Sequence, residues 1–197
     1  MIIGLDIDNV IADLDKTLLE EFLKEDINKR NLGIINPNAE HMTQGMFDWT
    51  KEEINEFLEK NMERMAMKLE LVKDAKFYID KLRENGNIIY LITGRNKRHF
   101  KNPIKTTKKW LLDKEINYDK LIFTKDSRDK SKECLENKVD IMFDDRPINC
   151  SKLQENGINS YLFKTRYNYN YSLNVQMVDD WENLFNLIMG AKYEINK

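Results

Sequence analysis

Short apolar segments of strand length alternate along the chain with segments whose apolar residues recur at helical spacing. This alternation is typical of a parallel sheet flanked by helices, because parallel neighbours need a crossover connection, usually a helix. The strands that the pattern predicts are Ile2–Asp8, Asn87–Thr93, Lys120–Thr124, Asp140–Asp144 and Ser160–Phe163. The expected fold class is therefore α/β, with a doubly wound, Rossmann-like parallel sheet.

The segment between the first two predicted strands is much longer than a single crossover helix. It contains no clear strand, and two apolar stripes at helical spacing, one around Phe22 and one around Phe57, predict helices. We interpret residues 14–70 as a small helical lobe inserted after the first strand, above the strand ends. Residues 1–13 and 71–197 then form the core domain.

Composition limits the function classes further. A chain of 197 residues that is 41% hydrophobic can bury one sizeable core with a small accessory lobe. The formal net charge of -2 implies neither a general nucleic-acid surface nor a polyanion mimic. Because the apolar stretches are too short for a membrane span and the start lacks signal-peptide features, we expect a soluble, cytoplasmic protein. The oligomeric state stays open, with a homodimer as one option.

Pairs of carboxylates follow two of the predicted strands. Asp6 and Asp8 end the first apolar run, and Asp144 and Asp145 end the fourth. For either pair alone, a solvated turn is the simpler interpretation. The carboxyl ends of parallel strands meet in one crevice, however, and buried carboxylates that close together repel unless a cation holds them. The two pairs together predict a site for Mg²⁺, which prefers oxygen ligands.

The second predicted strand ends in Thr93, Gly94 and Arg95. These residues can offer a hydroxyl donor, an exposed backbone amide and a positive charge to one phosphate group. The alternative is that Thr93 caps the following segment while Arg95 lies in solvent.

Two aromatic segments are also open to two interpretations. Phe47 and Trp49, within the lobe, could stack on a nucleobase, although clustered aromatic residues beside helices commonly belong to a core. The stretch Tyr167-Asn168-Tyr169-Asn170-Tyr171 is either a surface loop or a platform for base stacking.

The order of these residues resembles the haloacid dehalogenase superfamily of phosphohydrolases, with matches at Asp6-Ile7-Asp8, Thr93, a lysine within residues 126–132, and Asp144-Asp145. The lobe stands where that superfamily has a helical cap. The Asp-x-Asp-Asn-Val start and the Asp-Asp-Arg-Pro ending look most like the 5'(3')-deoxyribonucleotidase group and its bacterial nucleotidase relatives. Thr93-Gly94-Arg95 departs from the Thr-Ser or Ser-Ser that is frequent in this group, which leaves the substrate open.

The residues themselves support phosphoryl transfer to a carboxylate. We expect Asp6 to attack phosphorus and form an aspartyl-phosphate, which divides hydrolysis into two easier steps. Because side chains two residues apart on a strand share a face, Asp8 can protonate the leaving oxygen and later deprotonate the attacking water. The resemblance implies that Thr93 donates to a phosphate oxygen and that a lysine stabilises nucleophile and phosphate together. We choose Lys130, at the predicted start of the helix before the fourth strand.

Lys132 and Lys125 are the reserve candidates for that lysine. The expected metal ligands are the Asp6 side chain, the Asp8 backbone carbonyl and one or both of Asp144 and Asp145. The predicted function is a Mg²⁺-dependent phosphomonoester hydrolase, in first choice a nucleotidase of (deoxy)ribonucleoside monophosphates, with neither a nucleic-acid polymer nor a membrane as partner.

The alternatives are a phosphatase of sugar phosphates or another small metabolite, a receiver-like signalling domain that accepts phosphate, and an inactive relative that only binds. A receiver fits less well because the middle strands lack its phosphoacceptor acid and it has no use for a long helical insert.

Overall fold

The computed structural model describes residues 1–39, 42–168 and 175–195 and has a six-stranded sheet in which every pair of neighbours is parallel. The strands are β1 (Ile2–Leu5), β2 (Ile88–Thr93), β3 (Lys120–Phe123), β4 (Ile141–Asp144), β5 (Asn159–Phe163) and β6 (Met177–Val178). Their order is β3-β2-β1-β4-β5-β6, so the winding reverses between β1 and β4. This doubly wound arrangement confirms the expected fold class.

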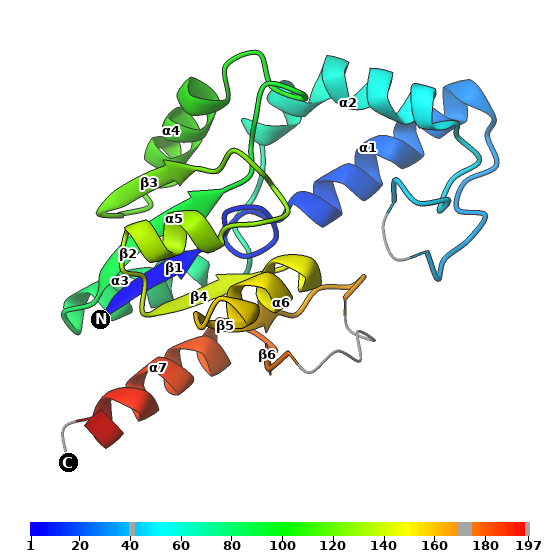
Figure 1. Cartoon of the computed structure of the whole chain (residues 1–197). Helices are drawn as coiled ribbons and strands as arrows, with labels where there is room; N and C mark the ends of the chain where they lie inside the picture. Colours follow the sequence, from blue (N-terminus) through cyan, green and yellow to red (C-terminus); the bar gives the residue numbers. More distant parts are fainter. Residues whose placement is uncertain (40–41, 169–174, 196–197) are drawn as a thin grey trace.

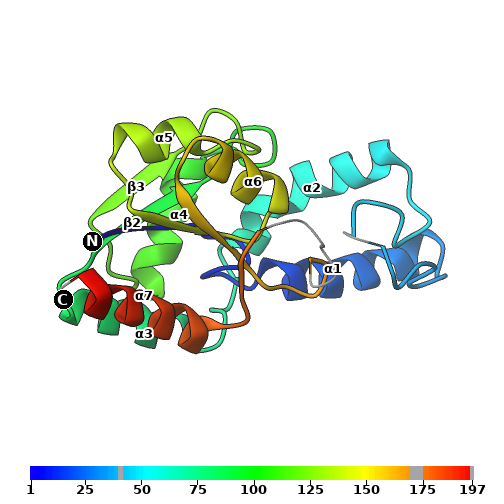
Figure 2. The ribbon, with the colours of Figure 1, turned by 60° about the horizontal axis from the view of Figure 1, so that its bottom comes forward.

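Helices cover both faces of the sheet (Figure 1). The helices that follow the lobe are α3 (Ala75–Glu84), α4 (Pro103–Asp113), α5 (Ser131–Glu136), α6 (Pro147–Glu155) and α7 (Trp181–Ile195). Figure 2 shows α5 and α6 on one face and α3 and α7 on the other. Trp110 of α4 belongs to the same buried cluster as α3 and α7. In the described part of the chain, no helix is both long and apolar enough to cross a membrane.

Successive residues of β1 point to opposite faces of the sheet. Ile3 and Leu5 are fully buried in the cluster beneath α3 and α7. Gly4 points to the opposite face, where an added Cβ would lie 2.6 Å from the Sδ atom of Met142 and 3.0 Å from Val139. The lack of a side chain at this position therefore leaves room for the side chains of Met142 and Val139 over the centre of the sheet.

The chain turns directly after β1, so the prediction that this strand continues to Asp8 is wrong. The Ile7 carbonyl accepts hydrogen bonds from the amides of Ile11 and Ala12, at 2.9 and 2.8 Å. Asn9 adopts a left-handed backbone conformation with a φ of 63°. Asparagine tolerates this region better than most residues. The apolar residues of the segment are buried within a turn rather than along a strand.

The helices α1 (Leu14–Lys29) and α2 (Lys51–Ala66) project beyond the carboxyl ends of the strands (Figure 1). The chain enters and leaves this lobe through two segments that are bonded to each other. The Asp13 amide donates to the Glu70 carbonyl at 2.9 Å, and the Val72 amide donates to the Ile11 carbonyl at 2.8 Å. The lobe is thus joined to the sheet by a paired stalk, which consists of residues 11–13 and 70–72.

Aromatic residues form the interior of the lobe. Phe22 of α1 stacks on Trp49 with ring centroids 4.8 Å apart, and Phe57 of α2 meets Phe22 edge to face at 4.9 Å. The Trp49 indole donates to Asp26 at 2.7 Å, and Asp26 also accepts from two backbone amides of the following loop. These contacts connect both helices of the lobe with the loop between them.

A carboxylate of the lobe caps a core helix. Asn102 precedes α4, but its side chain makes no capping hydrogen bond. Instead Glu63 of α2 accepts from the Asn102 amide at 2.9 Å and from the Thr106 hydroxyl at 2.6 Å, and the bond from Thr106 lowers the pKa of Glu63. A negative charge at a helix N-terminus is favourable because it satisfies free amides and complements the helix dipole.

We expect Glu63→Ala to lower the free energy of unfolding by about 1 kcal/mol, the usual cost of losing an N-terminal cap. Urea denaturation monitored by circular dichroism measures this change. Glu59→Ala is the matched control, because Glu59 is an exposed residue of the same helix. Equal midpoints for the two variants would contradict the capping role.

Candidate active site

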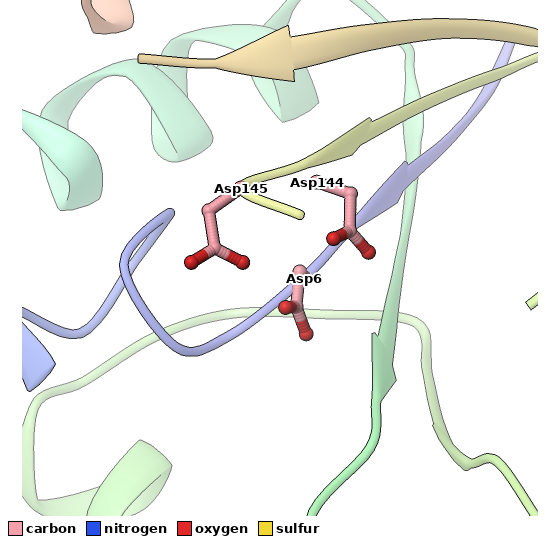
Figure 3. A group of neighbouring side chains, drawn as sticks. All are labelled: Asp6, Asp144 and Asp145. Carbon is pink, nitrogen blue, oxygen red and sulfur yellow. The ribbon is translucent and has the colours of Figure 1, made fainter. Parts of the chain in front are cut away.

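Three carboxylates gather where the winding of the sheet reverses (Figure 3). Asp6 follows β1, Asp144 ends β4, and Asp145 comes next in the chain. All three are buried, and one oxygen from each lies within 4.8 Å of the others. In doubly wound sheets the functional crevice lies at this point, outside the carboxyl ends of the strands. The structure thus brings together three of the four predicted metal ligands through their side chains.

Lys130 contacts two of these three carboxylates. Its Nζ atom is 2.8 Å from Oδ1 of Asp6 and 2.7 Å from Oδ2 of Asp144, and its side chain is 1% exposed. Burial opposes its charge, but Asp144 and Asp6 together raise the pKa of Lys130, so it stays protonated. Lys132 pairs with a glutamate on the surface of α5, and Lys125 is exposed. Of the three candidate lysines, only Lys130 contacts the acidic cluster.

Asp144 and Asp145 accept hydrogen bonds from two amide side chains and one phenol. The Asn149 side chain donates to both oxygens of Asp144, at 3.0 and 3.1 Å. Asn9 donates to Oδ2 of Asp145 at 2.8 Å, and the Tyr167 hydroxyl donates to the same atom. None of these three residues is among the metal ligands or catalytic residues expected from the sequence. Asn149 is two positions inside α6, and Tyr167 lies in the aromatic stretch noted above, so position along the chain gave little indication of either contact.

The cluster holds more negative than positive charge. If all groups ionise, three carboxylates face one ammonium group in a buried site, and this leaves a deficit of two positive charges. Burial raises the pKa of Asp6 well above its usual range; Lys130 opposes this shift, and the neighbouring carboxylates add to it. Burial and Asp144 raise the pKa of Asp145 to about 6. An all-oxygen donor set with this deficit fits a divalent cation of the magnesium type.

The raised pKa of Asp145 makes stability depend on pH in metal-free protein. A folded pKa of about 6 against an ordinary value near 3.8 means that the folded state keeps a proton which the unfolded chain releases. The stability contributed by this group is present below about pH 4 and is lost as the pH rises through about 6.

Thermal unfolding in a chelator from pH 4 to 7 tests this dependence. We expect wild type to lose stability relative to Asp145→Asn across that window, and added Mg²⁺ to reduce the loss because the metal binds the ionised form. Parallel pH curves for the two proteins would contradict it.

Asp8 lies apart from the three carboxylates. Its oxygens accept from Nε of Arg95 at 3.0 and 3.2 Å, and its Oδ1 accepts from Nη2 at 2.6 Å. The Asp8 side chain keeps 23% exposure, whereas that of Arg95 has 1%. We expected Arg95 to extend toward a substrate phosphate. This geometry does not match that expectation, because Nε and Nη2 of Arg95 donate to Asp8.

Thr93 and Gly94 form the end of β2. Thr93 is buried, and its hydroxyl oxygen accepts from the Arg95 amide at 3.2 Å. An added Cβ at Gly94 would lie 2.7 Å from the Cβ of Ser127. The close approach of the loop that carries Lys130 thus requires glycine at position 94. Both residues lie at the carboxyl edge of the sheet, as the sequence predicts.

The structure bears on both interpretations offered for each aromatic segment. Phe47 and Trp49 are 2% and 8% exposed and belong to the interior of the lobe, so neither ring offers a face for a nucleobase. The interpretation as core is the one that the packing supports. Of the second stretch, residues 169–171 lie outside the described residues. Tyr167 and the buried Asn168 contact Asp145 directly, through its side chain and its carbonyl respectively, so this part is no simple surface loop.

A doubly wound sheet, an inserted lobe and a buried acidic cluster with a lysine define a hydrolase of the haloacid dehalogenase type, a class whose members are generally metal-dependent. The chain belongs to the family described as "5' nucleotidase, deoxy (Pyrimidine), cytosolic type C protein", whose model matches residues 1–194. It is therefore a phosphatase of the nucleotidase group.

Curated relatives agree with this assignment. The chain is 29% identical over 138 residues to a nucleotidase of Clostridium acetobutylicum, covering 70% of this chain and 69% of that protein. It is 31% identical over 112 residues to a Bacillus cereus protein named "Putative nucleotidase", and the match spans 56% of each chain.

Solved structures show the same fold at low identity. A haloacid dehalogenase-like hydrolase from Streptococcus pneumoniae superposes with a TM-score of 0.64 at 13% identity, covering 95% of this chain and 97% of the other. A haloacid dehalogenase-superfamily hydrolase from Geobacter sulfurreducens gives a TM-score of 0.62 at 10% identity, covering 94% and 98%.

Proposed function

We propose that the protein is a Mg²⁺-dependent phosphomonoesterase that hydrolyses (deoxy)ribonucleoside monophosphates through an aspartyl-phosphate. The observation that carries the chemistry is the buried cluster of Asp6, Asp144 and Asp145 around Lys130. The family, described by its action on deoxy pyrimidine 5' nucleotides, supports the substrate class.

In the first step an oxygen of Asp6 attacks phosphorus, the bond to the ester oxygen breaks, and Asp8 gives its proton to that oxygen as it leaves. In the second step water attacks phosphorus of the aspartyl-phosphate, Asp8 takes the proton from the water, and Asp6 departs as carboxylate. Lys130, 2.8 Å from Oδ1 of Asp6, favours the ionised form of this carboxyl group and holds it in place. The Thr93 hydroxyl lies at the edge of the sheet where a phosphate oxygen would accept from it.

Asp6 and the Asp8 carbonyl, together with Asp144 or Asp145, would hold the magnesium ion. Of the last two we favour Asp145, because the donors found for it among the described residues converge on Oδ2 and leave Oδ1 for the metal. Asp144 already accepts from Asn149 and from the Arg146 amide and pairs with Lys130. When bound, the ion would neutralise the phosphoryl oxygens and reduce repulsion of the attacking carboxylate.

Residues 14–70, as a cap above the strand ends, would select the substrate, since inserts over a rigid scaffold commonly carry specificity. Phe47 and Trp49 are not part of this proposal, because both rings are buried in the lobe.

A panel of nucleoside 5'- and 3'-monophosphates, deoxynucleotides and sugar phosphates, with Mg²⁺ or with a chelator, tests the proposal by release of inorganic phosphate. We expect Mg²⁺-dependent release with a preference for nucleotides. Absence of metal-dependent release from every substrate would overturn the enzymatic proposal. A preference for sugar phosphates would remove the nucleotide and keep the mechanism.

A further inference from the structure

Arg95 binds the Asp8 carboxylate with two of its nitrogens. Nε and Nη2 together approach both oxygens of Asp8, at 2.6 to 3.2 Å. Such a forked contact fixes the orientation of a carboxylate as well as its position, which a single hydrogen bond does not do. Asp8 lies in the turn after β1, where its backbone forms an isolated bridge with Ala12 that does not fix the direction of its side chain.

The guanidinium group of Arg95 also contacts three other residues of the core. Its Cζ atom lies 5.6 Å from the centroid of the Phe100 ring and 5.8 Å from that of Trp110. The third nitrogen, Nη1, donates to the Thr107 hydroxyl of α4 at 3.3 Å. A buried arginine between two rings loses little further freedom when it binds a carboxylate. Rigid elements of the core thus determine where Asp8 points.

Arg95 and Asp8 differ in burial, and this difference indicates which of the two can reach a substrate. Arg95 is almost fully enclosed, whereas Asp8 retains enough exposure to meet a substrate. Arg95 is therefore poorly placed to bind a phosphate group directly. Its effect on a bound substrate would be exerted through Asp8, the more exposed partner.

We propose that Arg95 is a positioning residue, which holds the Asp8 carboxyl group in the orientation needed for its protonated form to give a proton to the leaving group. This inference rests on the proposed role of Asp8 as acid and base. Proximity and orientation contribute strongly to such transfers, so a loosely held Asp8 would transfer its proton less often.

The dependence of rate on the leaving group tests the proposal. A nucleoside alkoxide needs a proton as it leaves, whereas p-nitrophenolate is a stable anion and needs little assistance. For Arg95→Gln we expect kcat/KM to fall by about 100-fold with a nucleoside monophosphate and by less than about 5-fold with p-nitrophenyl phosphate. The ratio kcat/KM is the proper measure because it covers the steps up to departure of the leaving group and excludes the later attack of water.

A double-mutant comparison gives an independent result. If Arg95 acts through Asp8, Arg95→Gln introduced into Asp8→Asn should cause almost no additional loss. Arg83→Gln is the matched control, since Arg83 lies on α3 in a surface ion pair with Asp119. Equal losses with both substrates, or a double variant whose loss is the product of the two single losses, would overturn the proposal.

Two further variants keep the test valid if Arg95→Gln folds poorly. Thr107→Val leaves Arg95 in place and removes only its support at Nη1, and Arg95→Lys keeps the charge without the fork. For both variants we expect kcat/KM to fall more with the nucleoside monophosphate than with p-nitrophenyl phosphate, by smaller factors than for Arg95→Gln. Thermal unfolding curves would confirm that both proteins are folded. Absence of selectivity in both would also overturn the role. Failure of wild type to hydrolyse any phosphomonoester would instead overturn the proposed function.

Discussion

Asp6→Asn is expected to reduce kcat by about 10⁴-fold or more, because an amide cannot serve as the nucleophile that accepts the phosphoryl group. Asp6 contacts Lys130, and one of its oxygens lies within 4.8 Å of an oxygen of each of the other two carboxylates. The measurement is steady-state release of inorganic phosphate in the presence of Mg²⁺, with the substrate that wild type hydrolyses fastest in the panel of phosphomonoesters. In wild type, acid-quenched samples should also carry a phosphoryl adduct in intact-mass spectra, and the variant should lack it.

Asp113→Asn serves as the control for this prediction, because Asp113 forms an exposed ion pair with Lys109 on α4, away from the cluster. It should retain the activity of wild type. Substantial turnover by Asp6→Asn would exclude the aspartyl-phosphate pathway, even if the protein remained a phosphatase.

Lys130→Met is expected to be the most damaging substitution for the fold. The change keeps the length of the side chain and removes its charge, which leaves Asp6 and Asp144 buried without their cation. Breaking a buried ion pair by removing one partner commonly costs about 3–5 kcal/mol. We expect a loss of this size in metal-free protein near pH 7.5, measured by urea denaturation, together with loss of activity.

The loss should become smaller as the pH falls toward 5, because the unpaired carboxylates can then take up protons at less cost. Lys132→Met is the control, since Lys132 is an exposed residue two positions along the same segment. It should change stability by less than about 0.5 kcal/mol. Equal effects of the two substitutions would show that Lys130 is not the counter-charge of the cluster.

The sheet was predictable because each strand is an apolar run bounded by polar residues, and four of the five predicted strands agree with the structure within one residue at each end. The first was too long because Ile7, Val10 and Ile11 are as apolar as a strand and are buried in a turn. The strand β6 was not predicted, since two residues are too few to establish any periodicity.

The site was predictable where side chains follow strand ends and, for Lys130, from the resemblance together with its place at the start of α5. Asp6 and Asp144 meet because β1 and β4 are neighbours, which follows from the topology. The partner of Asp8 could not be read from the sequence, because Arg95 is 87 positions away and its direction depends on Phe100 and Trp110. Tyr167 reaches Asp145 from a loop without regular spacing. The burial of Phe47 and Trp49 depends on how two helices pack, and composition does not determine that.

The paired stalk of the lobe has a consequence for the length of the lobe. Because Asp13 and Val72 are bonded to Glu70 and Ile11, the two points where the lobe leaves and rejoins the core are already neighbours. Lengthening or exchanging the intervening segment costs little closure entropy when its ends are fixed side by side. The lobe can therefore be lengthened or exchanged while the sheet and its acids stay in place.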